Sequence, residues 1–481
     1  MKTLKETSIS ALLWNFVDRF GQQAMFLVIS VVLARLLSPN DYALIGILAI
    51  FTALSTVLVD SGFAQILIRG KNITSNDFST IFFFNTLVGV ILYIILFSLA
   101  PLIAKFYDYD QQQLISLSRV LFLCIPINAF GSAQSIFLIK HLVFKTTAKI
   151  ALISVLLSGI TGISAALCGW GVWALVAQLI SLSIFKTFFL WIWGQWKPSM
   201  YFDINFVKKG FVFSSNIMGA NAISIFLNNI YTSIIGRYFP LAQAGFYSQA
   251  NKFADMSSTI IVGVIQSSMY PILTKIRDDD ERLKRACRKT VRTLSFFLFP
   301  VSLGLICIAK PLFIIFLTAK WEASIPYFQL LCVAGIFLPL TMLNNNFLHT
   351  KGFVNLVLKL EIVKFIITML SLILTIRTGI INIIIGLIAA RFICFVITSL
   401  VGGAKINYSI VEQCKDIAPY AIISAVMAAV IYPMVFFIDN LYILITLQIA
   451  TGLAIYISAN KMLGSKIFEE IRGIIFKKKR N

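Results

Sequence analysis

The sequence is poor in charge and in the residues on which active-site chemistry depends. Only 13% of its 481 residues are charged and only two are histidines, whereas soluble domains carry charge at about 25% of positions. The seven cysteines are scattered and form no CxxC pair, which argues against a disulfide framework and a metal site. His141 and His349 lack the nucleophile and base of a catalytic constellation. We therefore expect neither an enzyme nor a bound metal or cofactor.

Long polar segments are also missing. The chain is 59% hydrophobic, with a mean hydropathy of +0.89. Apolar segments of at least 18 residues, the length of a membrane-spanning helix, recur fourteen times. The longest predicted outer segment, KFYDYDQQQ at 105–113, is too short to hold the acceptor of a glycan polymerase. We predict an all-α, polytopic integral membrane protein of about fourteen transmembrane helices, which acts inside its helix bundle as a transporter does.

Acidic residues are half as frequent as basic ones, 20 against 41, which gives a net charge of +21. If the N-terminus is cytoplasmic, the predicted inner segments hold 29 of the cations and the outer segments hold four. Such an asymmetry follows the positive-inside rule, so we predict that both termini are cytoplasmic. Cations placed beside a membrane contact anionic lipid, and nucleic acid is not expected as a partner.

Ionisable residues remain within the predicted spans, where a charge costs about 2.5–3.5 kcal/mol and is expected to face the bundle interior or a watery cavity. The cavity candidates, five cations and two amides, are Arg19, Lys252, Arg391, Arg119, Lys186, Asn221 and Asn228. Hydrogen bonding between helices is the alternative role for these polar side chains. Asp18, Asp60 and Asp255 are candidates for binding a coupling proton or sodium ion; each would equally serve to neutralise a neighbouring cation.

An internal repeat is present in the sequence. ARLLSPNDYALIG at 34–46 and GRYFPLAQAGFYS at 236–248 match at an offset of 202 residues, with Arg35 opposite Arg237. Repeats of this kind are typical of transporters that bind substrate between two lobes. The predicted divisions are a six-helix lobe at 1–194, a cytoplasmic linker at 195–209, a second six-helix lobe at 210–401, and a last helix pair with a basic tail at 402–481.

Two segments carry a resemblance to a known family. LARLLSPNDYALIGILAIFTALSTVLVDSGFAQILIR at 33–69 and GRYFPLAQAGFYSQANKF at 236–253 resemble signatures of the polysaccharide transporter (PST) family. That family belongs to the multidrug, oligosaccharidyl-lipid and polysaccharide (MOP) exporter superfamily, whose lobes are of the MATE type. Ala43 departs from the glycine expected after Asp-Tyr.

The resemblance implies a flippase for undecaprenyl-pyrophosphate-linked oligosaccharide, the repeat unit of an O-antigen, capsule or exopolysaccharide, in the bacterial cytoplasmic membrane. Spans in which cations outnumber acids suit a pyrophosphate ligand, which arginine binds bidentately. The implied partners are the lipid-linked substrate, membrane lipids, a proton or sodium gradient, and other polysaccharide-assembly proteins. The alternatives are a lipid II-type flippase and a cation-coupled multidrug exporter of the same superfamily.

Overall fold

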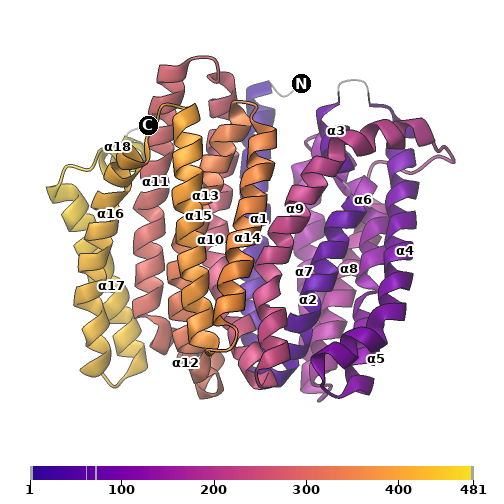
Figure 1. Ribbon diagram of the computed structural model, residues 1–481, viewed down its shortest axis with the longest axis horizontal. Helices are drawn as coiled ribbons and strands as arrows, with labels where there is room; N and C mark the ends of the chain where they lie inside the picture. Colours follow the sequence, from indigo (N-terminus) through magenta and orange to yellow (C-terminus); the bar gives the residue numbers. More distant parts are fainter. Residues whose placement is uncertain (1–3, 61, 71–72, 478–481) are drawn as a thin grey trace. The chain divides into compact units, whose positions relative to one another are not determined.

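The computed structural model describes the backbone of residues 4–60, 62–70 and 73–477, and every regular element in those ranges is a helix (Figure 1). The α-helices are α1 (Leu4–Leu36), α2 (Pro39–Asp60), α3 (Phe63–Arg69), α4 (Ser75–Tyr107), α5 (Gln111–Leu121), α6 (Cys124–Lys140), α7 (Phe144–Leu167), α8 (Val172–Trp193), α9 (Ile204–Tyr238), α10 (Leu241–Lys275), α11 (Asp280–Cys307), α12 (Ala309–Leu317), α13 (Ile325–Thr350), α14 (Val354–Thr375), α15 (Ile380–Lys405), α16 (Ile410–Ile431), α17 (Leu441–Met462) and α18 (Lys466–Lys477). Two short 3₁₀ helices, η1 (Ala319–Ser324) and η2 (Tyr432–Phe436), complete the chain order. The all-α prediction is confirmed.

Ten helical segments of the described chain are long and apolar enough to cross a membrane. α1 contributes to this search only as the shorter apolar stretch Phe20–Leu36. α14 is 22 residues long but carries Lys359, Glu361 and Lys364, and such charges lower the hydropathy of the segment. The protein is therefore a polytopic membrane protein, and the count of fourteen spans stays a prediction.

The chain divides into two compact units, Met1–Ser248 and Gln249–Asn481. In the first unit α7 packs between α1 and α8, and α4 packs on α6. In the second unit α13 packs on α15, and α11 packs on both α13 and α16. α9 begins in the predicted linker and continues into the predicted second lobe, but it packs along α2 and so clusters with the first unit. The division into two six-helix lobes remains a proposal.

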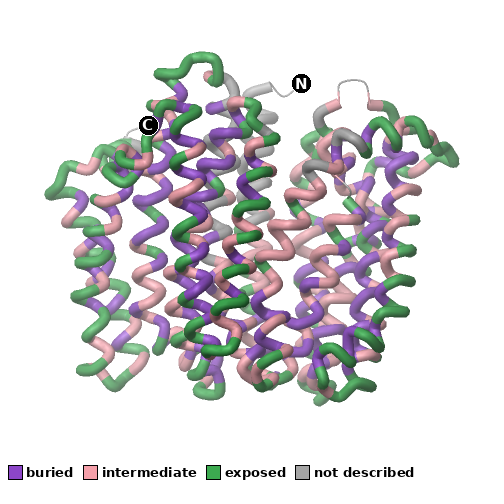
Figure 2. The backbone as a smooth tube through the Cα atoms, in the orientation of Figure 1, coloured by how far each residue is buried: buried purple, intermediate pink, exposed green. Residues whose placement is uncertain are grey.

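Apolar side chains are distributed as a bilayer requires. Buried residues follow the helix faces that meet other helices, and exposed residues follow the opposite faces (Figure 2). Many of the exposed ones are large and apolar, such as Leu102 on α4 and Leu374 on α14, at 63% and 69% exposure. Apolar surface of this extent is stable against lipid tails. The helices therefore pack through one face and contact the membrane through the other.

Two predicted spans contain a break. Hydropathy predicts one helix at 42–68, but the structure has α2 followed by the short α3, because Gly62 has a φ of 72°. A Cβ atom at Gly62 would also lie 2.7 Å from Cβ of Ser214 on α9, so only glycine fits there. The segment predicted at 114–138 is divided between α5 and α6.

The two turns that carry the internal repeat contact each other. A Cβ atom at Gly245, in the first turns of α10, would lie 1.9 Å from the carbonyl oxygen of Pro39, at the start of α2. Glycine is therefore required at this position of the second copy, since any side chain would collide with backbone. Ala43 of the first copy is fully buried.

Candidate functional site

The second unit brings together an acid and a cation that the sequence singled out separately. On α10, Nδ2 of Asn251 donates a 2.9 Å hydrogen bond to Oδ2 of Asp255, one turn away. The guanidinium of Arg391, on α15, acts electrostatically on the same carboxylate. Arg391 is half-buried. The structure thus gives Asp255 a polar setting built from two helices.

Lys252 lies on the same helix but behaves differently. It is exposed, and no ion pair or hydrogen bond joins it to another residue that the structure describes. It is eleven residues from Leu241, about 16 Å along the helix axis. α10 contains a span predicted from the sequence, and a charged side chain that far into a span is expected to face water or a polar ligand. Lys252 is therefore available to an anionic ligand.

The first unit holds a second pair of predicted residues. Asp60, at the end of α2, and Lys186, on α8, interact electrostatically, and both side chains are exposed. On α1, Nε2 of Gln22 donates a 2.7 Å hydrogen bond to Oδ1 of Asp18. The two acids thus have different neighbours, and the neighbour of Asp60 is a cation that the sequence assigns to the cavity.

The remaining cavity candidates are not gathered into one group. Asn221 and Asn228 are both exposed on α9, seven residues apart, which places them on one face of the helix. Arg119 of α5 lies with its guanidinium carbon 4.2 Å from the ring centroid of Phe97, a cation–π contact within the first unit. The side chain of Arg19 lies outside the described residues.

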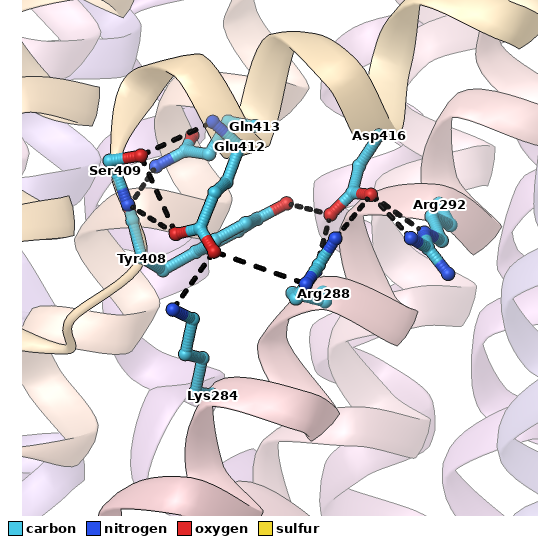
Figure 3. Close-up of polar contacts among 8 residues, drawn as sticks. All are labelled: Lys284, Arg288, Arg292, Tyr408, Ser409, Glu412, Gln413 and Asp416. Carbon is cyan, nitrogen blue, oxygen red and sulfur yellow. Dashed lines mark hydrogen bonds and ion pairs between the residues drawn. The ribbon is translucent and has the colours of Figure 1, made fainter.

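A charged cluster that sequence reasoning missed joins α11 to α16 (Figure 3). The carboxylate of Asp416 is 2% exposed and accepts hydrogen bonds from three side chains. Nε and Nη2 of Arg288 donate at 2.8 and 3.1 Å, and Nε and Nη2 of Arg292 donate at 2.9 and 2.5 Å. The hydroxyl of Tyr408 donates at 2.9 Å.

The cluster also includes the capped N-terminus of α16. Ser409 caps α16 in a capping box with Glu412. Glu412 also forms an ion pair with Lys284, whose Nζ lies 2.9 Å from Oε1. Burial and the neighbouring Asp416 carboxylate raise the pKa of the Tyr408 phenol well above its usual value, so this hydroxyl stays protonated and donates. The cluster fixes the first turns of α16 against α11.

The sequence does hold a signal for this cluster. Lys284, Arg288 and Arg292 are spaced by four residues, and so are Glu412 and Asp416, so each set forms a stripe on one helix face. Hydropathy and charge predict a cytoplasmic loop at 274–293, whereas α11 begins at Asp280. The basic stripe could be paired with the acidic stripe only if this stretch were known to be helical.

A third polar group lies between α13 and α14. Nζ of Lys364 is 2.8 Å from both carboxylate oxygens of Glu361, and Nδ2 of Asn345 donates to Oε1 at 2.9 Å. Glu361 and Asn345 are buried. The carboxylate is thus neutralised within its own helix and held to α13, which is an arrangement that stabilises packing.

The described residues contain no group of three or more histidine, cysteine or acidic side chains able to hold a metal ion. The candidate binding groups among these residues are instead cations and amides. In the second unit Lys252 is exposed and Arg391 is half-buried. In the first unit Lys186 and the Asn221 and Asn228 amides are exposed, and an amide can hydrogen-bond neutral polar groups. Cations suit anionic ligands, and amides suit hydroxyl-bearing ones.

Comparisons with known proteins bear on this chemistry. A family model described as polysaccharide biosynthesis protein matches residues 32–326. An uncharacterized membrane protein in the cps region of Klebsiella pneumoniae is 26% identical, over 98% of this chain and 98% of that one. The succinoglycan biosynthesis transport protein ExoT of Rhizobium meliloti (strain 1021) is 23% identical, over 68% of this chain and 66% of the relative.

Solved structures of the same fold are membrane transporters. The lipid II flippase MurJ, in an inward closed conformation, has a TM-score of 0.72 at 15% identity, covering 94% of this chain and 98% of its own. An inward-facing multidrug resistance MATE family transporter of the MOP superfamily has a TM-score of 0.62 at 16% identity, covering 80% and 94%. At these identities the likeness establishes the fold.

Proposed function

We propose, since the chain belongs to the polysaccharide biosynthesis protein family, that it is a flippase for lipid-linked oligosaccharide repeat units. It is a multi-pass protein of the bacterial inner membrane and a transporter, not an enzyme. The repeat unit, joined to undecaprenyl pyrophosphate, crosses from the inner to the outer face and then enters O-antigen, capsule or exopolysaccharide synthesis. The name of the succinoglycan relative, a transport protein, supports this assignment.

The observation that carries the proposal is the exposure of Lys252 on α10. Lys252 is an exposed residue of α10, which contains a span predicted from the sequence, and it lies three residues before Asp255, whose carboxylate interacts with Arg391. A pyrophosphate offers several anionic oxygens, each able to accept a charge-assisted hydrogen bond. In our proposal Lys252 and Arg391 receive the pyrophosphate, with Arg19 and Lys186 contributing positive potential, and the Asn221 and Asn228 amides bind sugar hydroxyls.

The proposed movement is alternating access between two lobes, 1–194 and 210–401, with the pair at 402–481 attached to the second. Transporters built from repeats hold their substrate near the bilayer midplane and rock one repeat against the other. Asp60 and Asp255 are proposed to couple this movement to a proton or sodium gradient. Other polysaccharide-assembly proteins are proposed to receive the product.

The test is flipping in vesicles that contain only the purified protein. Fluorescent undecaprenyl-pyrophosphate-linked oligosaccharide should become accessible to an impermeant quencher, and vesicles with Lys252→Gln should lose most of this signal. A cationic dye is the control substrate. Efficient dye efflux without lipid flipping would overturn the proposal in favour of a multidrug exporter.

A lipid II-type flippase is the second candidate, because the MurJ structure covers 94% of this chain. Both substrates carry a pyrophosphate between a polyprenyl chain and a sugar, so the cations described above suit either one. Parallel flipping assays with lipid II and a repeat-unit lipid separate the two functions. Preference for lipid II would make a lipid II-type flippase the better assignment.

The proposed orientation has both termini in the cytoplasm. Cysteines introduced at Asp110 and Asn440, between predicted outer helix ends, should react with a membrane-impermeant thiol reagent in intact cells that express a variant without native cysteines. Cysteines at Asp279 and Asn481 should react only after the membrane is opened. External labelling at Asp279 would reverse the orientation.

A further inference from the structure

A groove of about 440 Å³ lies among α11, α16 and α17, all in the second unit. Its wall on α11 includes Phe297 and Val301, and its wall on α17 includes Leu453 and Ile457. Each of these four side chains is exposed, so the groove opens on the bilayer-facing surface of the unit. Met427 and Ile431 of α16 line it as buried residues.

Small residues create this space. Pro300, Gly304 and Gly452 all line the groove. A Cβ atom at Gly304 would have its nearest neighbour, Cε of Met427, 4.0 Å away, and one at Gly452 would meet ordinary contacts at 3.5 Å and beyond. These glycines are therefore not required by close packing of the helices. They leave a channel that larger residues would fill.

Hydrogen bonds hold the walls at both ends. Pro300 has no N–H group, so the carbonyl of Phe296 lacks its helical partner, and the Tyr456 hydroxyl of α17 donates to that carbonyl at 2.8 Å. At the other end Nε2 of Gln448 donates to the carbonyls of Cys307 and Ile431, at 3.3 and 3.1 Å. The groove is thus preformed and does not depend on a ligand to keep its walls apart.

Two lysines flank the Tyr456 end of the groove. Lys461 is exposed and lies one turn beyond Ile457 on α17. Lys289 lies two turns before Phe296 on α11, is about half-exposed, and has Nζ 2.6 Å from Oε2 of Glu470 on α18. Because the Tyr456–Phe296 bond aligns the two helices, both lysines lie at a similar height, about 8–11 Å beyond it by helix rise.

We propose that this groove is a binding site for an anionic phospholipid, with one acyl chain between α11 and α17 and the phosphate between Lys289 and Lys461. The apolar walls of the groove suit an acyl chain, and the two lysines beyond its end suit an anionic headgroup. The site lies on α11, α16 and α17, whereas the proposed substrate cations of this unit lie on α10 and α15. The lipid site is therefore separate from the proposed substrate cations of this unit.

A bilayer phospholipid fits the groove better than the polyprenyl chain of the proposed substrate does. The cavity of about 440 Å³ accommodates a single chain of bilayer length, whereas a polyprenyl chain several times larger would leave most of its length outside. A lipid bound through a pair of exposed lysines also exchanges with the surrounding leaflet. We therefore assign the site to phospholipid, and polyprenyl phosphate becomes the competitor in the test.

The test is native mass spectrometry of the delipidated full-length protein, titrated with phosphatidylglycerol or with phosphatidylcholine of the same chains. Phosphatidylglycerol should bind about tenfold more tightly, and Lys461→Gln should remove most of that preference, since a charge-assisted contact is lost. Lys359→Gln, an exposed cation of α14, is the matched control and should keep the preference. Glu470→Gln should also keep it, because Lys289 stays charged.

The groove itself is tested by filling it. Gly304→Leu should weaken binding of both lipids, and Gly304→Val offers a smaller step should the leucine variant fail to fold. Equal binding of the two lipids by the wild-type protein, or unchanged binding by a folded Gly304 variant, would overturn the proposal. Displacement of phosphatidylglycerol by an equal concentration of polyprenyl phosphate would likewise overturn it and make the groove a substrate site.

Discussion

Asp416 and Lys252 are ionised groups of the same unit with opposite surroundings. Asp416 is buried and accepts hydrogen bonds from Arg288, Arg292 and Tyr408, whereas Lys252 is exposed and forms no ion pair with a described residue. A buried charge with all its partners stabilises the packing around it, and its removal leaves those partners unpaired. An exposed charge in a membrane helix is available to ligands. The difference separates a structural charge from one proposed to bind substrate.

The largest effect is expected at Asp416. Asp416→Asn leaves two arginines facing an uncharged amide, and loss of one partner from such a pair costs about 3 kcal/mol or more. We expect a lower thermal unfolding temperature in detergent and less protein in the membrane. Glu412→Gln, whose side chain is 31% exposed, is the control and should change both much less. Equal stability of Asp416→Asn and wild type would contradict the structural role.

At Lys252 we expect loss of transport without loss of protein. A charge-assisted contact contributes about 1.5–3 kcal/mol, so Lys252→Gln should slow flipping about tenfold or more. Unfolding temperature and membrane level should stay unchanged, because no described partner is left unpaired. Two results together would contradict this. Lys252→Gln would be destabilised, and the double variant Lys252→Gln/Asp255→Asn would recover both the membrane level of the protein and its flipping activity. Lys252 would then be a structural partner of Asp255.

Asp60 and Asp255 are expected to differ from Lys252 in what their neutral variants lose. Asp60→Asn and Asp255→Asn should each weaken the dependence of flipping on an imposed proton or sodium gradient, since an amide binds neither ion as a carboxylate does. Downhill flipping should persist at a rate above that of Lys252→Gln. Flipping rates in vesicles with and without the gradient measure this. If both variants keep full gradient dependence, these carboxylates do not couple transport.

The smallest effect is expected at Tyr408. Tyr408→Phe removes one of the hydrogen bonds to Asp416 but leaves both arginines in place, so the cost should be about 1.5 kcal/mol, the low end for a hydrogen bond to a charged group. Thermal unfolding should shift by a fraction of the shift seen for Asp416→Asn, and transport should be unaffected. A loss as large as that of Asp416→Asn would show that the arginines do not hold the carboxylate without the phenol.

The sequence was sufficient for the class of fold because hydropathy is a local property. Runs of apolar residues mark helices one at a time, and the family signature at 33–69 needs no tertiary information. The breaks at Gly62 and after α5 were not predicted, since hydropathy continues across both. Lys252 and Asp255 were identified from helical spacing, but the interaction of Asp255 with Arg391 depends on how α10 and α15 pack.

The cluster at Asp416 could not be predicted for a different reason. Its cations lie in a stretch so basic that it reads as a loop beside the membrane, and its acid lies near the start of a predicted span. Only the packing of α11 on α16 shows that the two charged stripes face each other. The groove was also hidden, because Pro300, Gly304 and Gly452 are far apart in sequence and ordinary as single residues.

The bond between Tyr456 and the carbonyl of Phe296 has a consequence for biosynthesis. The two residues are 160 positions apart, so α11 is synthesised and inserted long before its partner exists. Until α17 follows, the carbonyl freed by Pro300 has no donor, and an unsatisfied backbone group in lipid is costly. α11 therefore completes its own hydrogen bonding only when α17 is inserted. A nascent chain that stops before α17 should carry a defect in α11 and be degraded faster than its length alone would predict.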